Sequence, residues 1–287
     1  TAETPNQLVN GIADAEVATG VTRVLVIGDA LAGGLGAGMT RMAQEQNGFE
    51  IINRFNESSG LARTEVYDWA GALSKIVAAK PVDAVVVLVG VNDRQGIKDG
   101  NIRYVFRAPE WAKGYTSNVD RLIEAVNAAQ AKLYWISIPP MADSAFDADM
   151  RYLSDIHRER VAAKGGQYID VRPFFVAADG SYVDRGPDET GVERKLRSRD
   201  GITFFKQGNN RFGQLVLGAI KSLDKNAIPA VVSTPPANAI EPKVAAQSPV
   251  VTEPPSFGQD GLDGESLVFR ADSLKAASAA AAPTKSA

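Results

Sequence analysis

The sequence predicts an α/β protein, a three-layer α/β/α sandwich around a five-stranded parallel sheet. Five short apolar runs alternate with amphipathic stretches between residues 22 and 226, which is the pattern of strands joined by crossover helices. The run at residues 23–27 is apolar at successive positions rather than at every second one, as expected for a strand that is buried on both faces. These two observations define the predicted fold class.

The five strands follow from the apolar runs. The first is expected at residues 23–27 (RVLVI), which lead directly into Gly28-Asp29. Residues 82–89 (VDAVVVLV) carry the clearest strand pattern, because they are rich in β-branched residues. The other strands are expected at residues 49–53, 132–137 and 167–171.

Four helices are expected between and after these strands, at residues 35–46, 115–131, 148–164 and 209–223. In the second of them, Val119, Leu122, Ile123 and Val126 recur at helical spacing and predict one apolar face. Gly165-Gly166 is a helix stop signal and predicts the end of the third.

Composition excludes several classes of function. The chain of 287 residues has no Cys and a single His, so thiol catalysis, disulfides and Cys- or His-rich metal sites are excluded. The net charge of -3 gives no reason to expect a nucleic-acid partner. No apolar run approaches the roughly 20 residues of a membrane-spanning helix. The missing Cys and the Thr at position 1 lead us to expect a periplasmic or otherwise exported protein whose signal peptide has been removed.

Three zones differ in composition. Residues 1–21 are expected to be an N-terminal extension, residues 22–226 the folded domain, and residues 227–287 a disordered tail rich in Pro, Ala and Ser. Within that tail, residues 266–269 are apolar enough to dock on a protein partner or on the chain's own domain.

The chemistry is expected in the loops that follow the strands, because ligands bind at the carboxyl ends of open parallel sheets. Four loops should meet there. They are Gly28-Asp29-Ala30, residues 58–63 (SSGLAR), residues 90–95 (GVNDRQ) and residues 199–204 (RDGITF).

These four segments, in this order, resemble the SGNH hydrolase superfamily of GDSL-type esterases and lipases. The family's GDS, lone Gly, GxND and DxxH blocks correspond to Gly28-Asp29-Ala30, Gly60, GVND at 90–93 and DGIT at 200–203. The chain looks most like one uncharacterised exported bacterial branch of this superfamily. That closer resemblance lies in SSGLARTEVYDW, GVNDRQ, ISIPPM and residues 182–208. The resemblance covers roughly residues 22–223 and implies the flavodoxin-like SGNH fold.

The resemblance also implies an incomplete catalytic site. Ala30 stands at the position of the nucleophilic Ser, and Thr203 at that of the general-base His. Asp200 corresponds to the acid that orients this His. Because a hydroxyl needs an adjacent base to become a nucleophile, acyl transfer by the family mechanism is not expected. Gly60 and Asn92 match oxyanion-hole positions, together with the backbone N–H that follows the nucleophile, and such donors bind a carbonyl oxygen without a nucleophile.

Several alternatives stay open at this stage. Ala30 could be an engineered replacement of Ser, and Ser58 or Ser59 could replace the nucleophile, although both are typical turn residues. His157 could replace the base only if its helix faced the site; a solvent-facing or helix-packing role is expected instead.

Two further features of the sequence bear on metals and cofactors. Asp29, Asp93 and Asp200 could hold a hard cation, but the residue matching Asp29 is structural in the family, and no metal is expected. Gly33-Gly34-Leu35-Gly36 does not fit a dinucleotide loop, so no cofactor is expected.

Basic side chains could reach an anionic ligand. The candidates are Arg63, Arg94, Arg197 and Arg199, with Asp29 as a further contact. Residues 185–199 mix basic and acidic side chains, which is also the pattern of an ordinary solvated loop.

The sequence therefore predicts a catalytically degenerate protein with a binding or scaffolding role, with an acylated glycan, cell-wall material or a small anion as ligand. The alternative is an active carboxylester hydrolase of the O-acetylesterase type. A third reading is an assembly subunit that binds its partner through the tail.

Overall fold

The computed structural model describes residues 20–46 and 48–225; the predicted N-terminal extension, save residues 20 and 21, and the predicted tail lie outside these ranges. Five parallel strands form one sheet in the order β2-β1-β3-β6-β7. They are β1 (Thr22–Gly28), β2 (Phe49–Phe55), β3 (Ala84–Leu88), β6 (Lys132–Ile136) and β7 (Gln167–Ile169). Counted along the sheet this is the flavodoxin-like order 2-1-3-4-5, so the predicted fold class is confirmed.

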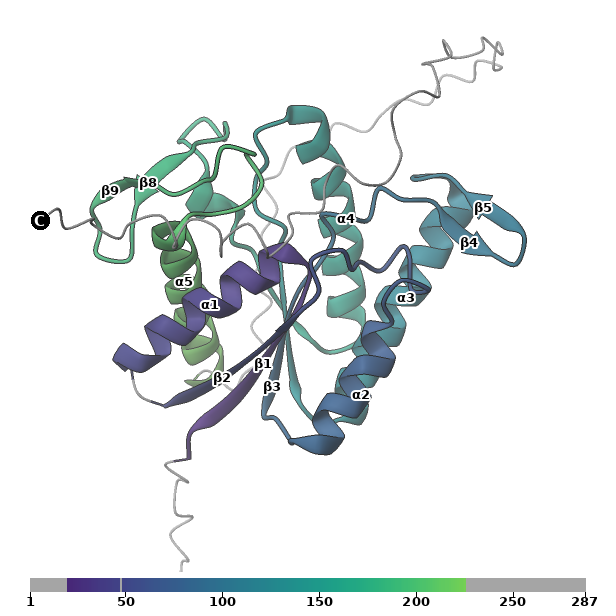
Figure 1. Cartoon of the computed structure of the whole chain (residues 1–287), viewed down its shortest axis with the longest axis horizontal. Helices are drawn as coiled ribbons and strands as arrows, with labels where there is room; N and C mark the ends of the chain where they lie inside the picture. The colour runs from purple at the N-terminus through teal and green to yellow at the C-terminus, as the bar shows by residue number, and fades with distance from the viewer. Residues whose placement is uncertain (1–19, 47, 226–287) are drawn as a thin grey trace, which may run out of the picture. The chain divides into compact units, whose positions relative to one another are not determined.

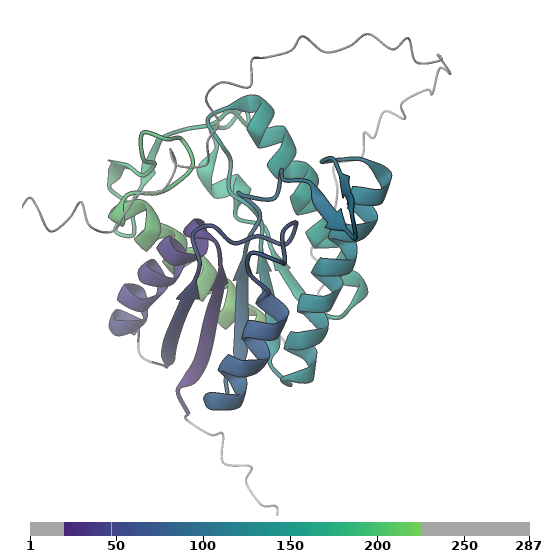
Figure 2. The ribbon, with the colours of Figure 1, turned by 45° about the vertical axis from the view of Figure 1, so that its right-hand side comes forward.

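Five helices cover the two faces of the sheet (Figures 1 and 2). One face carries α1 (Ala30–Gln46) and α5 (Lys206–Lys225), and the other carries α2 (Trp69–Ala79), α3 (Pro109–Ala128) and α4 (Ser144–Ala163). The inner strands between these layers are buried, with every residue of β3 buried and no exposed surface from Val24 to Ile27 in β1, whereas the edge strand β2 is only half-buried. This explains the uninterrupted apolar runs in the sequence.

Helices α1 and α5 approach each other closely because both carry glycine at the contact. A Cβ built on Gly38 would lie 1.8 Å from the Asn209 backbone oxygen, and one on Gly213 would lie 2.5 Å from the backbone of Gly38. The Gly-rich start of α1 is therefore a packing surface, and a nucleotide loop is not needed to explain it.

The structure differs from the predicted elements in several places. Helix α1 begins at Ala30 rather than at residue 35, α3 begins at Pro109 rather than at 115, and α4 begins at Ser144. Helix α2 was not predicted. Two short antiparallel hairpins were also missed, β4 (Ile97–Asp99) with β5 (Ile102–Tyr104), and β8 (Arg185–Pro187) with β9 (Glu193–Lys195). A 3-10 helix, η1 (Arg172–Phe175), follows β7.

None of the helices in residues 20–46 and 48–225 is long and apolar enough to cross a membrane.

Candidate functional site

The candidate site lies at the carboxyl edge of the sheet, beside β1 and β3. The strand order reverses there, because β2 lies on one side of β1 and β3 on the other, and ligands of such sheets bind at this point. The predicted loops follow β1, β2 and β3. The fourth loop is held at the same edge, since the Ala142 N–H beyond β6 donates to the Gly201 carbonyl over 3.1 Å.

Asp29 joins the first and third of these loops. Its Oδ2 accepts hydrogen bonds from the backbone N–H groups of Gly90 and Val91, at 2.8 and 3.0 Å, and its Oδ1 accepts one from Leu31 at 3.0 Å. Burial raises the pKa of Asp29 to about 7, although these three donors lower it. Asp29 is fully buried, so its predicted role as a ligand contact is wrong and its role is structural.

Asp93 fixes the second loop in the same way. Its carboxylate accepts hydrogen bonds from the backbone N–H groups of Leu61 and Ala62, each at 2.8 Å, and from the Tyr115 hydroxyl at 2.9 Å. Gly60 must stay without a side chain here, because a Cβ would lie 2.1 Å from Asp93 Oδ1. Burial raises the pKa of Asp93.

His157 closes this buried network. The Tyr115 hydroxyl lies 2.9 Å from His157 Nε2 as well as from Asp93. Since the hydroxyl has one proton and donates it to Asp93, the network assigns the imidazole proton to Nε2. Burial lowers the pKa of His157 to about 3, which keeps the ring neutral. The ring also packs on Trp135, so the predicted helix-packing role is confirmed.

Two of the donors expected in an oxyanion hole are already engaged. Asn92 Nδ2 donates to the carbonyl groups of Glu57 and Ser59, each over 2.8 Å. These bonds use both hydrogens of the amide. The Leu31 N–H donates to Asp29. In this conformation Asn92 holds the second loop in place, and binding a ligand oxygen requires it to exchange one of these bonds.

Ala30 and the Asp200 loop stand at the positions that the sequence predicts for the nucleophile and for the acid and base. Ala30 is the first residue of α1 and is partly exposed. The Thr203 hydroxyl donates to Asp200 Oδ2 over 2.6 Å, while the N–H groups of Ile202 and Thr203 donate to Oδ1. Partial burial disfavours the charged carboxylate, but these hydrogen bonds outweigh it and lower the pKa of Asp200.

The two serines of the second loop have structural partners. Ser59 is buried; its hydroxyl lies 2.7 Å from the Asn56 carbonyl and accepts a hydrogen bond from Trp69 Nε1 at 2.9 Å. The Ser58 N–H donates to the Asn56 side chain. Neither serine has a histidine beside it among the described hydrogen bonds, so neither resembles an activated nucleophile.

The predicted arginine contacts separate into two groups. Arg197 is buried and donates to the carbonyl groups of Gly201 and Ile202, with its guanidinium 4.1 Å from the Phe204 ring centre. Arg94 pairs with Asp149 over 2.9 Å. Arg197 and Arg94 are therefore not the ligand contacts that the sequence predicts, because both side chains are engaged by partners within the protein. Arg63 and Arg199 have no side-chain partner among the described residues and keep their guanidinium groups available.

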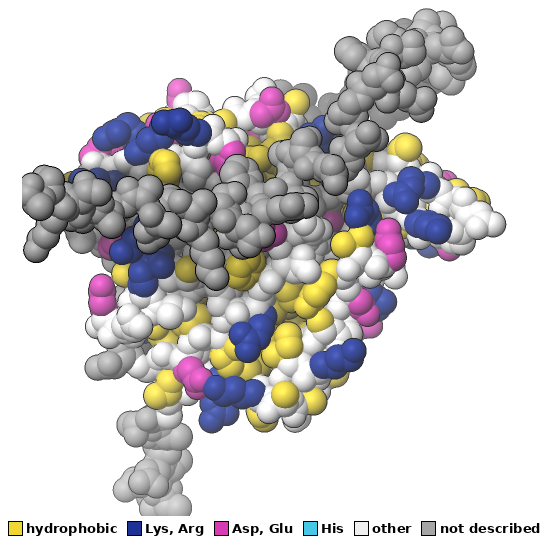
Figure 3. Space-filling view, in the orientation of Figure 1, with side chains coloured by type: hydrophobic (Ala, Val, Ile, Leu, Met, Phe, Trp, Pro, Cys, Tyr) yellow, Lys and Arg dark blue, Asp and Glu magenta, His cyan; other side chains and the backbone are white. Residues whose placement is uncertain are grey.

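The mixed-charge loop around β8 and β9 pairs its own charges. Arg194 lies 3.4 Å from Asp188, and Lys195 lies 3.2 Å from Asp184. Figure 3 shows basic and acidic side chains interspersed on the visible face rather than a field of one sign. Within residues 20–46 and 48–225, no group of His, Asp and Glu side chains is arranged to hold a metal ion.

The architecture resembles solved esterase structures. The inhibitor-bound aryl esterase of M. smegmatis superposes with a TM-score of 0.51 at 16% identity, covering 70% of this chain and 99% of its own. An alpha/beta hydrolase from the metagenome of Lake Arreo, Spain, gives 0.51 at 18% identity, with 71% and 97% covered. A catalytic mutant of an acetylxylan esterase from Geobacillus stearothermophilus gives 0.50 at 14% identity, with 70% and 94% covered.

At these identities the likeness establishes the fold alone. Residues 23–219 match the family described as "Protein of unknown function (DUF459)", and the chain belongs to this family. No curated protein matches the chain.

Proposed function

We propose that this protein is a catalytically degenerate SGNH-fold protein that binds its ligand without hydrolysing it. The observation that carries this proposal is the pair of side chains at the catalytic positions. Ala30 offers no hydroxyl, and Thr203 donates its own proton to Asp200 instead of accepting one. A nucleophile and a base are both needed for acyl transfer, so this edge of the sheet is suited to binding.

The other candidate groups do not restore the missing pair. His157 is buried beneath Tyr115, and its pKa of about 3 makes it a poor proton acceptor at neutral pH. Ser59 is buried between Trp69 and the Asn56 carbonyl. No replacement machinery is therefore built from these residues.

The ligand is proposed to be an acylated glycan in the periplasm. The Gly60 N–H lies in a loop beside Ala30, and Asn92 can join it once its amide exchanges one of its two bonds to carbonyl groups. The unpaired guanidinium groups of Arg63 and Arg199 can add donors to an acyl carbonyl or a carboxylate. The likeness to an acetylxylan esterase supports an O-acetylated sugar as the first ligand to test.

A working carboxylester hydrolase is the second candidate, favoured by the esterase structures that share the fold. It requires a Ser at position 30 in the natural gene or a nucleophile outside the residues discussed above.

One experiment tests both proposals, binding without hydrolysis and ester hydrolysis. O-acetylated xylo-oligosaccharide is added to the protein, binding is measured by calorimetry, and acetate release is measured by proton NMR. Ala30→Arg fills the space at the start of α1, and Gln44→Arg is its matched control on the exposed face of the same helix. We expect wild type and Gln44→Arg to bind equally, and Ala30→Arg to bind at least about tenfold more weakly, a difference of about 1.4 kcal/mol.

No acetate should appear with any of the three proteins. Acetate release by wild type would establish the hydrolase reading. Absence of binding, or equal binding by Ala30→Arg, would contradict the proposed ligand site.

A further inference from the structure

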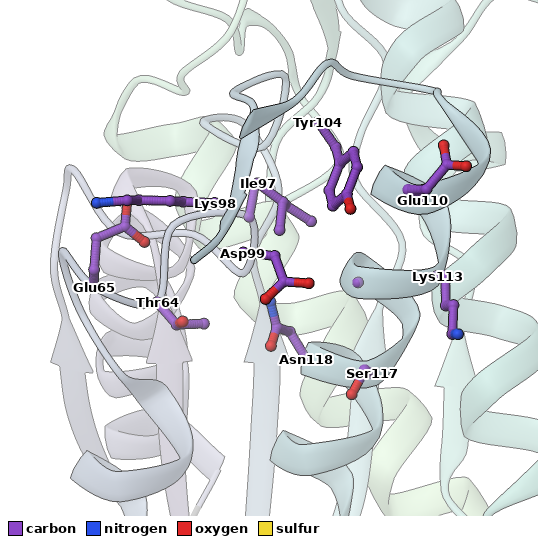
Figure 4. A pocket seen from close by; sticks show the side chains of 12 residues that line it. Thr64, Glu65, Ile97, Lys98, Asp99, Tyr104, Glu110, Lys113, Ser117 and Asn118 are labelled. Atoms are coloured by element: carbon purple, nitrogen blue, oxygen red, sulfur yellow. The ribbon is translucent and has the colours of Figure 1, made fainter. Parts of the chain in front are cut away.

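A separate cavity lies beside the candidate site and belongs to none of the positions discussed so far. Its volume is about 410 Å³, within the range of small-molecule sites. Three segments line it: the end of the second loop with the residues just beyond it (Ala62, Thr64 and Glu65), the hairpin β4–β5, and the first turns of α3. Figure 4 shows their side chains around a common space. Ala30, Asn92 and Thr203 do not line it.

The hairpin supplies one polar wall. Gly100 takes a positive φ of 57° at the turn between β4 and β5, a conformation suited to glycine in tight hairpins. This turn places Asp99 and Tyr104 at opposite ends of the paired strands. In Figure 4 the Asp99 carboxylate and the Tyr104 hydroxyl both point toward the centre of the cavity.

Helix α3 supplies the facing wall. Asn118 Nδ2 donates to the Leu61 carbonyl over 2.8 Å, which fixes the amide and leaves Oδ1 as an acceptor. Ser117 lines the cavity beside it, one turn beyond Gly114. Gly114 has no side chain to occupy the space, and a Cβ there would lie 3.3 Å from the Ile97 side chain. Gly114 thus lets the Ile97 side chain of the hairpin pack close to the helix, which brings the two walls of the cavity together.

Most polar side chains that line this cavity have no hydrogen-bond or ion-pair partner among the described residues. Among the described residues, none of the following makes a side-chain hydrogen bond or ion pair: Thr64, Lys98, Asp99, Tyr104, Lys113 and Ser117. The interior is polar on both walls, with Ile97 and Ala62 as apolar surface between them. A cavity that gathers free donors and acceptors in this way can satisfy a ligand carrying many hydroxyl groups.

We propose that this cavity binds a neutral oligosaccharide and holds one or two of its sugar units. A sugar hydroxyl both donates and accepts, so it can donate to Asp99 and accept from Lys113, Ser117 or Tyr104. The Tyr104 ring adds an amphipathic surface against which a sugar ring can pack.

The charges of the lining argue against an anionic ligand. The cavity has no arginine, and its lysines, Lys98 and Lys113, are outnumbered by the carboxylates of Glu65, Asp99 and Glu110. A phosphate or a polycarboxylate would meet net repulsion, and the bidentate arginine geometry that recognises such groups is missing.

The experiment measures binding of neutral xylotriose, chitotriose and maltotriose by calorimetry and ligand-observed NMR at millimolar concentration. Glycylglycine and inorganic phosphate serve as zwitterionic and anionic comparators. Asp99→Ala removes an exposed, unpartnered carboxylate, and Glu45→Ala removes an equivalent one on α1 as the matched control. Ser117→Arg fills the cavity from an exposed position of α3.

We expect at least one trisaccharide to bind, with affinity reduced about tenfold or more by Asp99→Ala, because a hydrogen bond to a charged group is lost. Ser117→Arg should abolish binding, and Glu45→Ala should leave it unchanged. The inference is overturned if no trisaccharide binds, if Asp99→Ala and Ser117→Arg bind as wild type does, or if only glycylglycine or phosphate binds.

Discussion

The Thr203 hydroxyl donates to Asp200 Oδ2 over 2.6 Å, so the residue at the base position satisfies the carboxylate that would otherwise orient a base. The N–H groups of Ile202 and Thr203 bind the other oxygen. The loop is therefore self-contained and needs no imidazole to keep its conformation. This relationship supports the proposal that the site has no general base, and with it the proposed binding role.

The hydroxyl of Tyr115 should contribute strongly to stability. It is hydrogen-bonded to the buried Asp93 carboxylate and to His157. Tyr115→Phe removes both bonds and leaves a buried charged acceptor with fewer donors. We expect the free energy of unfolding, measured by urea denaturation, to fall by about 1–3 kcal/mol. Tyr152→Phe removes a hydroxyl without a described partner and should change it by less than about 0.5 kcal/mol. Equal effects of the two substitutions would contradict the network.

His157 should make the protein less stable in acid. Its pKa is lowered by burial to about 3 in the folded state, against about 6.5 in an unfolded chain. The unfolded state therefore binds more protons between these values. Stability falls as the pH drops from about 6.5 toward 3, by up to about 1.4 kcal/mol per pH unit.

Asp29 acts in the opposite direction, because its pKa is raised to about 7 and protonation favours the folded state below that value. The difference between wild type and His157→Phe, taken at each pH, isolates the histidine. His157 is the only histidine in the sequence, so one imidazole NMR signal reports it. That signal should not titrate from neutral pH to about pH 4 in the folded protein; a midpoint near 6.5 would refute the prediction.

Arg197 should matter for folding and Arg199 should not. Arg197→Ala removes the donor to the Gly201 and Ile202 carbonyl groups and the packing on Phe204. The expected loss is at least about 2 kcal/mol in the free energy of unfolding, because a large buried side chain is deleted. Arg199→Ala alters an exposed side chain and should be within about 0.5 kcal/mol of wild type. Thermal and urea unfolding of both variants measures the two effects. If Arg197→Ala left the free energy of unfolding unchanged, the structural role of Arg197 would be wrong and the side chain would again be a candidate ligand contact.

The centre of the sheet could be predicted from the sequence because β1 and β3 are buried on both faces and therefore appear as unbroken apolar runs, as in Val24–Ile27. The start of α1 could not, because its glycines have low helix propensity and are present for close contacts with α5 and β2. The hairpin β4–β5 was missed because strands of three polar or mixed residues carry no periodic signal.

The motif positions of the candidate site could be assigned from the sequence, but their internal bonds could not. Asn92 is engaged by carbonyl groups more than 30 residues away in the chain, and Asp29 by N–H groups 61 and 62 residues away. Such pairings depend on the packed fold. The burial of Arg197, in a loop that otherwise looks solvated, depends in the same way on Phe204 and the 201–202 turn.

The measurement that tests the degenerate site most directly is hydrolysis of a small activated acetyl ester by wild type, by Ala30→Ser and Thr203→His singly, and by the double variant. The account predicts turnover only in the double variant, since nucleophile and base are required together, and loss of that turnover when Asn92→Ala is added. Turnover by the unmodified protein that persists in Asn92→Ala would contradict the assignment of the site and require a different nucleophile.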